Sequence, residues 1–379
     1  MSGIYIHIPF CKQACSYCDF HFTTSLKYVD EMTDAICQEI TKKKNRITDQ
    51  VGTIYFGGGT PSVLPNKHFE KIFNTINRHF SVAQDAEITI EANPDDLDAK
   101  RISEMKQLPV NRFSIGIQSF FEEDLIWMNR AHNVNEAENC IKRSQDAGFE
   151  NLSIDLIYGY PLLTDSKWLR NINQAVSFEI PHISAYSMTV EPRTALASAI
   201  KKGKQVPIND EQSASQFLSL IEKLGESGYQ HYEISNFSKP GQHAVHNTNY
   251  WRGVPYLGIG PSAHGFDGQT RYLNMANNAA YLSKLEAGQL AETIEELSLY
   301  DRFNEYIMTS LRTMWGTELQ KLELDFGKLF LADTLKNIQP FIARNWLVNR
   351  DGYLILTMDG KLFADYIASE LFLSEDEHR

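Results

Sequence analysis

The first half of the chain alternates short apolar runs with longer amphipathic stretches. Apolar residues three and four positions apart predict a helix face, and in one stretch Phe69, Ile72 and Ile76 share such a face. Five stretches predict helices: 26–44, 67–79, 98–108, 134–147 and 167–178. Six runs rich in β-branched and aromatic residues predict strands: 3–8, 53–56, 87–92, 112–118, 151–157 and 182–187.

This alternation predicts an α/β fold with a parallel sheet, because parallel neighbours need a crossover that usually contains a helix. Six strand–helix units are too few for a closed eight-stranded barrel. We therefore expect a partial (β/α)6 TIM-like barrel, and a doubly wound sheet is the alternative. In both architectures ligands bind at the C-terminal ends of the strands.

The rest of the chain is organised differently. A helix is predicted at 209–227, followed by a polar loop (NFSKPGQHAVHNTNYWRG) and a Gly/Pro-rich stretch (YLGIGPSAHGF). Further on, helices alternate with short loops up to a hairpin at 346–357, a final helix at 359–372 and a polar tail. We divide the chain into a barrel (1–200), a barrel extension (201–290) and a smaller C-terminal α+β, winged-helix-like domain (291–379).

Composition narrows the classes of partner. Apolar residues make up 42% of the chain, enough to form a core, and the net charge is −12. This acidic balance argues against nucleic acid as the main partner. No apolar run approaches the ~18 residues of a membrane span, and the first ten residues lack the basic start of a signal peptide. We expect a cytoplasmic protein with no transmembrane segment.

Three of the five cysteines, Cys11, Cys15 and Cys18, crowd into a CxxxCxxC motif directly after the first predicted strand. Such crowding predicts metal ligation rather than disulfides. Three thiolates can hold three irons of a [4Fe–4S] cluster and leave the fourth open to S-adenosylmethionine, which the cluster can reduce to a 5′-deoxyadenosyl radical. The alternative is a structural zinc site with His7 or His21 as the fourth ligand.

A second motif, Gly57-Gly58-Gly59-Thr60-Pro61, follows the second predicted strand. Glycines let a backbone approach a ligand closely. Taken alone, the motif is equally compatible with a plain turn. In a strand–helix series that starts with CxxxCxxC, it predicts a cradle for the methionine end of S-adenosylmethionine.

Four segments carry a resemblance to a known family: residues 5–11 (YIHIPFC), 15–20 (CSYCDF), 57–61 (GGGTP) and 154–159 (IDLIYG). They resemble the oxygen-independent coproporphyrinogen III dehydrogenase superfamily of radical S-adenosylmethionine proteins, over essentially the whole chain.

Within that superfamily the chain is more similar to the branch regarded as haem chaperones. Phe20 stands where the dehydrogenases have a fourth cysteine, and ten residues precede Cys11 where the dehydrogenases carry a longer arm. Residues 246–251 (HNTNYW) match the HNxxYW motif of the haem-binding proteins.

The resemblance implies a set of cofactor contacts. Asp155 and Arg130 also have structural interpretations, as a buried hydrogen-bonded acid and as a surface partner of a carboxylate. The implied S-adenosylmethionine contacts are Tyr5 and Tyr17 on either side of the molecule, Gly58, Gly59 and Thr60 as its cradle, Glu91 at a polar group, and Gln118, Arg130 and Asp155 at positions that contact a second molecule in the dehydrogenases.

The resemblance also implies that His246, Tyr250 and Trp251 bind haem b. An imidazole can ligate haem iron, and flat aromatic rings can cover a porphyrin. His243 and His264 are alternative ligands, and Trp251 is equally compatible with packing against the barrel.

The resemblance favours a carrier that binds haem and delivers it to apo-haemoproteins such as membrane respiratory enzymes. The cluster and S-adenosylmethionine would then control transfer or oligomeric state, and the family implies a homodimer. The alternative is an enzyme, a coproporphyrinogen III dehydrogenase that forms protoporphyrinogen IX by oxidative decarboxylation.

Overall fold

Six parallel strands form the centre of a twelve-stranded sheet in a computed structural model that describes residues 1–375. These strands are β1 (Ser2–Ile8), β2 (Val51–Gly58), β3 (Val82–Ala92), β4 (Arg112–Gln118), β5 (Asn151–Tyr158) and β6 (His182–Ser187). They lie side by side in chain order, so every crossover moves in the same direction. A doubly wound sheet reverses direction midway. The partial barrel is therefore confirmed, and the doubly wound alternative is wrong.

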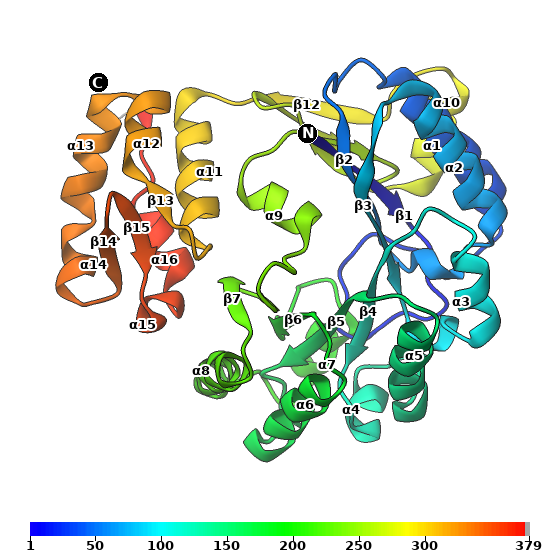
Figure 1. The fold of residues 1–379 in the computed structure, drawn as a ribbon, viewed down its shortest axis with the longest axis horizontal. Coiled ribbons are helices and arrows are strands. Elements are labelled where there is room, and N and C mark those ends of the chain that lie inside the picture. Colours follow the sequence, from blue (N-terminus) through cyan, green and yellow to red (C-terminus); the bar gives the residue numbers. More distant parts are fainter. Residues whose placement is uncertain (376–379) are drawn as a thin grey trace.

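The crossover helices cover the outer face of this sheet (Figure 1). They are α1 (Val29–Lys42), α2 (Asn66–His79), α3 (Ala99–Met105), α4 (Glu122–Trp127), α5 (Val134–Asp146) and α6 (Asp165–Ser177). The apolar face predicted for α2 is buried, including Phe69 and Ile72. Asn133 closes a capping box with Glu136, and the Thr164 hydroxyl accepts from the N–H of Lys167, which explains where α5 and α6 begin. The predicted helices are confirmed to within a few residues.

Additional strands extend the sheet at both edges. On one side, β9 (Tyr256–Ile259) pairs in parallel with β1, and β10 (His264–Phe266), β11 (Thr270–Asn274) and β12 (Glu292–Glu296) follow in antiparallel order. On the other side, β8 (Asn236–Ser238) and β7 (Gln230–Glu233) follow β6, accompanied by α7 (Ala195–Lys201) and α8 (Asp210–Glu226). Helix α10 (Asn278–Glu286) belongs to the first edge, between β11 and β12, and contacts α1 (Figure 1). Residues 292–296, which we assigned to the C-terminal domain, thus belong to the large sheet.

A buried ion cluster fastens this extension to α1. The Lys43 ammonium lies 2.6 Å from the Glu39 carboxylate and 3.0 Å from that of Glu292 on β12, and the side chains of Lys43 and Glu39 are fully buried. Glu39 also accepts hydrogen bonds from the Tyr281 hydroxyl (2.5 Å) and the Asn274 amide (2.7 Å). The cluster therefore joins residues that are more than 200 positions apart in the sequence.

The C-terminal domain has its own core and lies to one side of the barrel (Figure 1). It contains α11 (Leu299–Leu311), β13 (Thr317–Glu318), α12 (Leu319–Phe326), α13 (Lys328–Asn337), α14 (Gln339–Ala343), β14 (Leu347–Arg350), β15 (Tyr353–Leu356), α15 (Met358–Lys361) and α16 (Ala364–Glu370). The predicted hairpin is confirmed.

The single final helix predicted at 359–372 is wrong, because the chain forms α15 and α16 with a turn between them. At this turn the Phe363 ring stacks on Trp346 at 4.2 Å, which a continuous helix would not provide. The predicted polar tail lies largely outside the described residues.

One further helix, α9 (Val245–Trp251), lies between the barrel and the C-terminal domain (Figure 1). Our prediction of an irregular polar loop is wrong for this segment. The Glu87 carboxylate accepts hydrogen bonds from the N–H groups of Val245 (3.0 Å) and His246 (2.9 Å). A carboxylate at this end satisfies free N–H groups and favours the helix.

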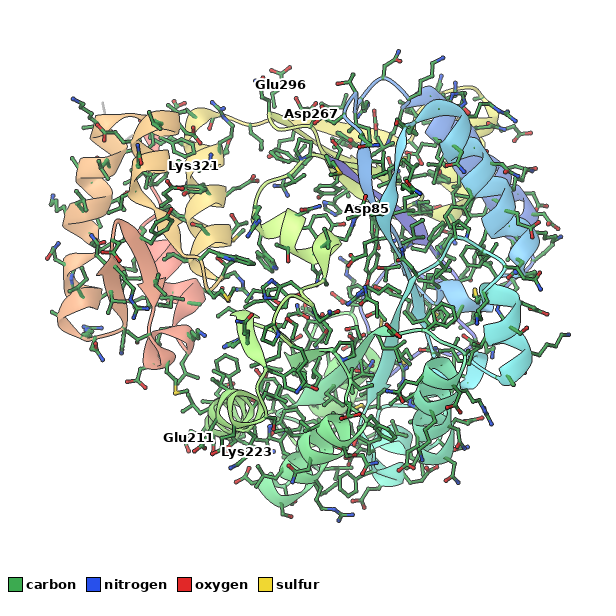
Figure 2. All side chains as sticks on the ribbon, viewed as in Figure 1. Asp85, Glu211, Lys223, Asp267, Glu296 and Lys321 are labelled. Atoms are coloured by element: carbon green, nitrogen blue, oxygen red, sulfur yellow. The ribbon has the colours of Figure 1, made fainter. Side chains whose placement is uncertain are left out.

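Charged side chains such as Glu211 and Lys223 lie on the outer side of α8 (Figure 2). Lys223 pairs there with Glu226. Within residues 1–375, no helix has the length and apolar character needed to cross a membrane.

Candidate functional site

The cysteine loop begins where β1 ends, at the C-terminal edge of the parallel strands. Backbone hydrogen bonds close its base, since the N–H of Cys11 donates to the Thr23 carbonyl and the N–H of Thr23 donates to that of Pro9. Cys11 is buried, while Cys15 and Cys18 are partly exposed. The structure thus places the three predicted ligands on one short, anchored loop with access to solvent.

Two side chains from other segments face the cysteine sulfurs, one just after β2 and one between α4 and α5. The Thr60 hydroxyl lies 3.3 Å from Cys11 Sγ, and Arg130 Nη1 lies 3.3 Å from Cys15 Sγ. Arg130 is held by the Asn93 side chain (2.7 Å) and by the Gly116 carbonyl (2.8 Å). Our alternative of Arg130 as a surface partner of a carboxylate is therefore wrong. A hydroxyl donor and a guanidinium both favour the thiolate form that binds metal.

The donor set fits a cluster better than a single zinc ion. Both ring nitrogens of His7 are engaged, with the Tyr5 hydroxyl (3.2 Å) and the His21 carbonyl (2.8 Å), and His21 Nε2 lies 2.7 Å from Asn278 Oδ1. In the described part of the chain, no three His, Cys, Asp or Glu residues converge on one metal ion. Each thiolate of a three-cysteine cluster binds a different iron, so its ligands lie farther apart than those around one zinc ion.

Burial raises the pKa of the Cys11 thiol to about 11 and that of Cys18 to about 12. Both thiols are therefore protonated near pH 7 when no metal is bound. Metal ligation must displace these protons, which makes cluster binding dependent on pH.

The glycines after β2 are required by contacts within the protein. Gly58 has φ = +105°, and a Cβ atom there would lie 2.4 Å from the His7 ring. A Cβ atom on Gly59 would lie 2.6 Å from the Phe10 carbonyl oxygen. The N–H of Thr60 donates to that same carbonyl. The motif therefore packs the end of β2 directly against the cysteine loop, and its role as a ligand cradle stays a prediction.

Glu91 lies beside this motif, at the end of β3. Its carboxylate accepts hydrogen bonds from the Tyr55 hydroxyl (2.8 Å) and from the N–H of Gly58 (3.1 Å). The Tyr5 ring stacks on Tyr55 at a centroid distance of 6.1 Å. Burial raises the pKa of Glu91 to about 7 and that of Asp155 to about 6.

These groups open into a polar cavity of about 190 Å³ inside the barrel. Asp155 lines this cavity, as expected for a cofactor contact. It also hydrogen bonds to Ser114 and Ser184, as expected for a buried structural acid. Its environment therefore agrees in part with each of the two interpretations. Gln118 and Tyr17 lie outside this lining, Tyr17 being next to Arg130. Predicted site residues that share the cavity are Tyr5, Glu91, Asp155, His246 and Tyr250.

Sequence patterns did not single out Tyr55, Arg112 or Asn93. Tyr55 and Arg112 line the polar cavity, and Asn93 holds Arg130. Each sits in or beside a strand that was predicted from its apolar residues. No spacing motif marks them, because only the sheet order brings them to one place.

Glu91 leads to a prediction about pH. Because its pKa rises from 4.5 to about 7 on folding, the folded protein holds a proton that the unfolded chain releases, and stability falls as pH rises through this window. Glu91→Gln removes this dependence. Relative to the wild type, the variant should gain roughly 3 kcal/mol in free energy of unfolding between pH 4.5 and pH 8.

Urea unfolding of the metal-free proteins at several pH values measures this gain. Glu150→Gln, which changes an exposed glutamate, serves as the control and should follow the wild type. Parallel pH profiles for Glu91→Gln and wild type would show that folding does not raise the pKa of Glu91.

His246 faces the barrel interior and is only 2% exposed. Its Nδ1 lies 2.7 Å from the Thr53 hydroxyl, its Nε2 lies 2.7 Å from the Tyr250 hydroxyl, and its ring stacks on Tyr55 at 5.1 Å. Burial lowers the pKa of His246 to about 3, so the ring is neutral. Both nitrogens are thus engaged while α9 is docked, which corrects our picture of a histidine in an open loop.

Trp251 and the two alternative ligands point elsewhere, whereas Tyr250 shares the cavity with His246. Trp251 is half-buried and lies under the Arg312 guanidinium at 5.4 Å, so it faces the C-terminal domain. The His243 ring lies 4.6 Å from Tyr232, with Nε2 only 3.3 Å from the Gln230 side chain. His243 is half-buried and His264 on β10 is exposed, so both alternative ligands reach solvent.

Comparisons with known proteins agree with this architecture. The model of the Radical SAM superfamily matches residues 5–175, and that of the HemN C-terminal domain matches residues 297–363. "Heme chaperone HemW" of Bacillus subtilis is 34% identical, over 97% of this chain and 98% of that protein. "Heme chaperone HemW" of Escherichia coli is 32% identical, over 98% of each chain. The solved structure of coproporphyrinogen III oxidase (HemN) from Escherichia coli shares the fold, with a TM-score of 0.85, 23% identity and coverage of 98% and 89%.

Proposed function

Because this chain belongs to the HemW family of the radical SAM superfamily, we propose that it binds haem b and delivers it to apo-haemoproteins, membrane respiratory enzymes among them. The observation that carries this proposal is the similarity along the whole chain to relatives named as haem chaperones. The position of α9, between the barrel and the C-terminal domain, supports it by placing the HNxxYW motif at the junction of two domains.

The family's cofactors are a [4Fe–4S] cluster and S-adenosylmethionine, and the residues present suit both. Cys11, Cys15 and Cys18 would hold the cluster, which supplies an electron for reductive cleavage of S-adenosylmethionine when both are bound. Tyr5, Tyr17, Gly58, Gly59, Thr60 and Glu91 would bind S-adenosylmethionine, with Gln118, Arg130 and Asp155 available for further contacts.

The chain's own residues prepare this site. Thr60 and Arg130 direct donors at cysteine sulfurs, which stabilises the thiolates. Glu91 fixes the N–H of Gly58 and the Tyr55 hydroxyl. In a carrier, occupation of this site would control haem transfer or the formation of a homodimer.

His246, Tyr250 and Trp251 remain our proposed haem contacts, and the structure defines what binding there requires. Iron ligation by His246 Nδ1 needs α9 to leave the barrel, because the Thr53 hydroxyl of β2 occupies that nitrogen. Ligation by Nε2 needs Tyr250, which lies on α9 itself, to release its hydrogen bond. For ligation by Nδ1, the apparent affinity for haem is then the intrinsic affinity multiplied by the fraction of molecules in which α9 is undocked. His243 can ligate iron without that movement.

Anaerobic haem titration followed by the Soret absorbance tests the proposal. Wild type should show saturable binding, and His246→Ala should weaken it or change the spectrum of the bound iron. His243→Ala and His264→Ala are the matched controls and should leave the spectrum unchanged. If one of these controls loses the signal instead, that histidine is the ligand.

Absence of saturable haem binding by the wild type would overturn the carrier function. Anaerobic conversion of coproporphyrinogen III to protoporphyrinogen IX by the reconstituted protein would then identify it as a dehydrogenase.

A further inference from the structure

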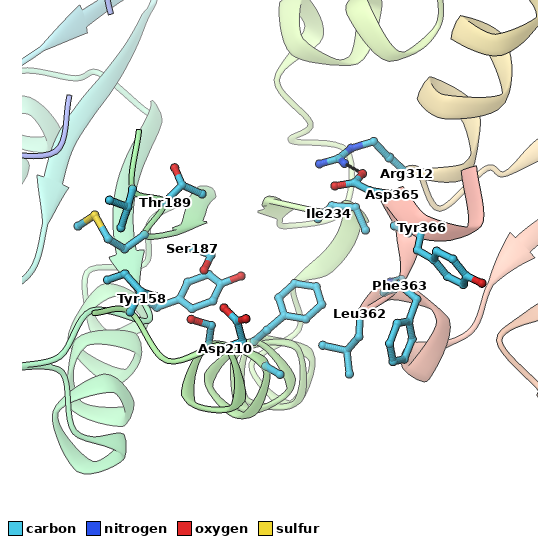
Figure 3. A pocket seen from close by; sticks show the side chains of 18 residues that line it. Tyr158, Ser187, Thr189, Asp210, Ile234, Arg312, Leu362, Phe363, Asp365 and Tyr366 are labelled. Carbon is cyan, nitrogen blue, oxygen red and sulfur yellow. Dashed lines mark hydrogen bonds and ion pairs between the residues drawn. The ribbon is translucent and has the colours of Figure 1, made fainter. Parts of the chain in front are cut away.

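A second cavity, larger than the one inside the barrel, lies between the barrel and the C-terminal domain (Figure 3). It encloses about 590 Å³, within the roughly 300–1,000 Å³ typical of sites for organic ligands. One wall is formed by the ends of β5 and β6, which carry Tyr158 and Ser187 (Figure 3). The opposite wall is the turn between α15 and α16 (Figure 3).

The two walls are joined at the edge strand β7. The N–H of Ile234, just after β7, donates to the Arg312 carbonyl at 3.1 Å. The N–H of Met314 donates to the Tyr232 carbonyl at 2.9 Å. These two backbone hydrogen bonds therefore hold the barrel and the C-terminal domain together beside the cleft.

Lys361 is a half-buried cation in this cleft and has no counter-ion among the described residues. Its ammonium donates to His231 Nδ1 at 2.8 Å, while His231 Nε2 lies 3.0 Å from the Ile234 carbonyl and carries the ring proton. Burial lowers the pKa of Lys361 to about 8, and no carboxylate of the described chain offsets this effect. A partly buried ammonium without an anion is unfavourable, so an anionic ligand group would be stabilised there.

The other charges of the cleft are already matched or come from α8. Arg312 pairs with Asp365, whose side chain is 80% exposed. Asp210 belongs to α8 (Figure 3). Arg312 also covers the Trp251 ring at 5.4 Å, so the cleft adjoins the last residue of the HNxxYW motif.

Apolar side chains complete the lining. Phe217 and Leu362 face the cleft, and Phe363 and Tyr366 are 39% and 46% exposed at its rim. Exposed aromatic rings around a cavity are typical of a surface that binds a flat apolar ligand.

We propose that this interdomain cleft holds the porphyrin macrocycle of the haem, with a propionate on the Lys361 ammonium and the ring against the apolar wall. The identity of the ligand rests on the proposed carrier function. Recognition of the ring and its carboxylates is independent of the iron, so metal-free porphyrin tests the cleft separately.

The test measures binding of haem and of metal-free protoporphyrin IX to the wild type and to Lys361→Met. We expect the variant to bind both at least about tenfold more weakly, because it loses a hydrogen bond between charged groups. Protoporphyrin IX dimethyl ester, which lacks the carboxylates, should bind the wild type as weakly as the acid binds the variant. Lys223→Met, which removes an equal charge from the outer side of α8, should bind like the wild type.

Thermal unfolding separates a ligand lysine from a structural one. Lys361→Met should melt at the same temperature as the wild type or higher, because it removes an unpaired, partly buried charge. Phe363→Ala provides a second variant, at the exposed rim, and should also weaken both porphyrins.

If the wild type, Lys361→Met and Phe363→Ala bind porphyrin with equal affinity, the proposal that the cleft binds the macrocycle is overturned. The proposed carrier function is then unaffected. If the wild type binds neither haem nor metal-free protoporphyrin IX, both proposals are overturned. Lysine-dependent binding of metal-free porphyrin without saturable haem binding would keep the cleft and refute the carrier.

Discussion

Replacement of Cys11, Cys15 or Cys18 by alanine should reduce cluster iron to below about a tenth of the wild-type content, since loss of a residue that only supports a metal ligand already costs about 10–100-fold in affinity. The loop offers no replacement, because His7 is committed to Tyr5 and to the His21 carbonyl. The fold should survive, because β1 and its neighbours are held by the apolar core and not by the loop.

Iron and sulfide analysis after anaerobic reconstitution measures this effect. Cys37→Ala is the matched control, since Cys37 is a partly exposed thiol on α1 far from the motif in sequence, and it should retain full iron. Unchanged iron in all three loop variants would contradict the assignment. Zinc in place of iron in the wild type would revive the structural zinc site.

Lys43→Met should lower the free energy of unfolding by about 3–5 kcal/mol, the usual consequence of removing one partner from a buried ion pair. The substitution leaves the Glu39 and Glu292 carboxylates buried without their cation. Asn274 and Tyr281 still donate to Glu39, but Glu292 keeps only Arg46.

Urea unfolding followed by circular dichroism checks this value, with Lys44→Met as the control because Lys44 is exposed on the adjacent position. The control should stay within about 0.5 kcal/mol of the wild type, as expected for a surface position. A loss below about 1 kcal/mol for Lys43→Met would mean that solvent reaches the two carboxylates.

The parallel core of the fold was predictable because its signal is local. Each of the six strands contains a short run rich in β-branched and aromatic residues, and most residues of these runs are buried. The seventh parallel strand, β9, was missed because YLGI is short and lies among glycines and prolines. Helix α9 was missed because its N–H groups are satisfied by Glu87, some 160 residues earlier in the chain.

For the candidate site, too, only the features that are local in the sequence were predictable. The cysteine ligands and the glycine motif are contiguous in sequence, so spacing alone reveals them. Tyr55 on β2 and Arg130, which follows α4, gain their roles only from the tertiary fold, which brings separate segments together beside the cysteine loop. The buried state of His246 was likewise hidden, because Thr53 and Tyr55 belong to a strand nearly 200 residues away.

The shared lining of the barrel cavity has a thermodynamic consequence. His246 and Tyr250 of α9 line the same space as Tyr5 and Glu91. A molecule that enters this space therefore meets different walls when α9 is docked and when it is withdrawn. Linkage then makes the coupling reciprocal: the factor by which that molecule shifts the docking equilibrium equals the factor by which withdrawal of α9 changes its affinity.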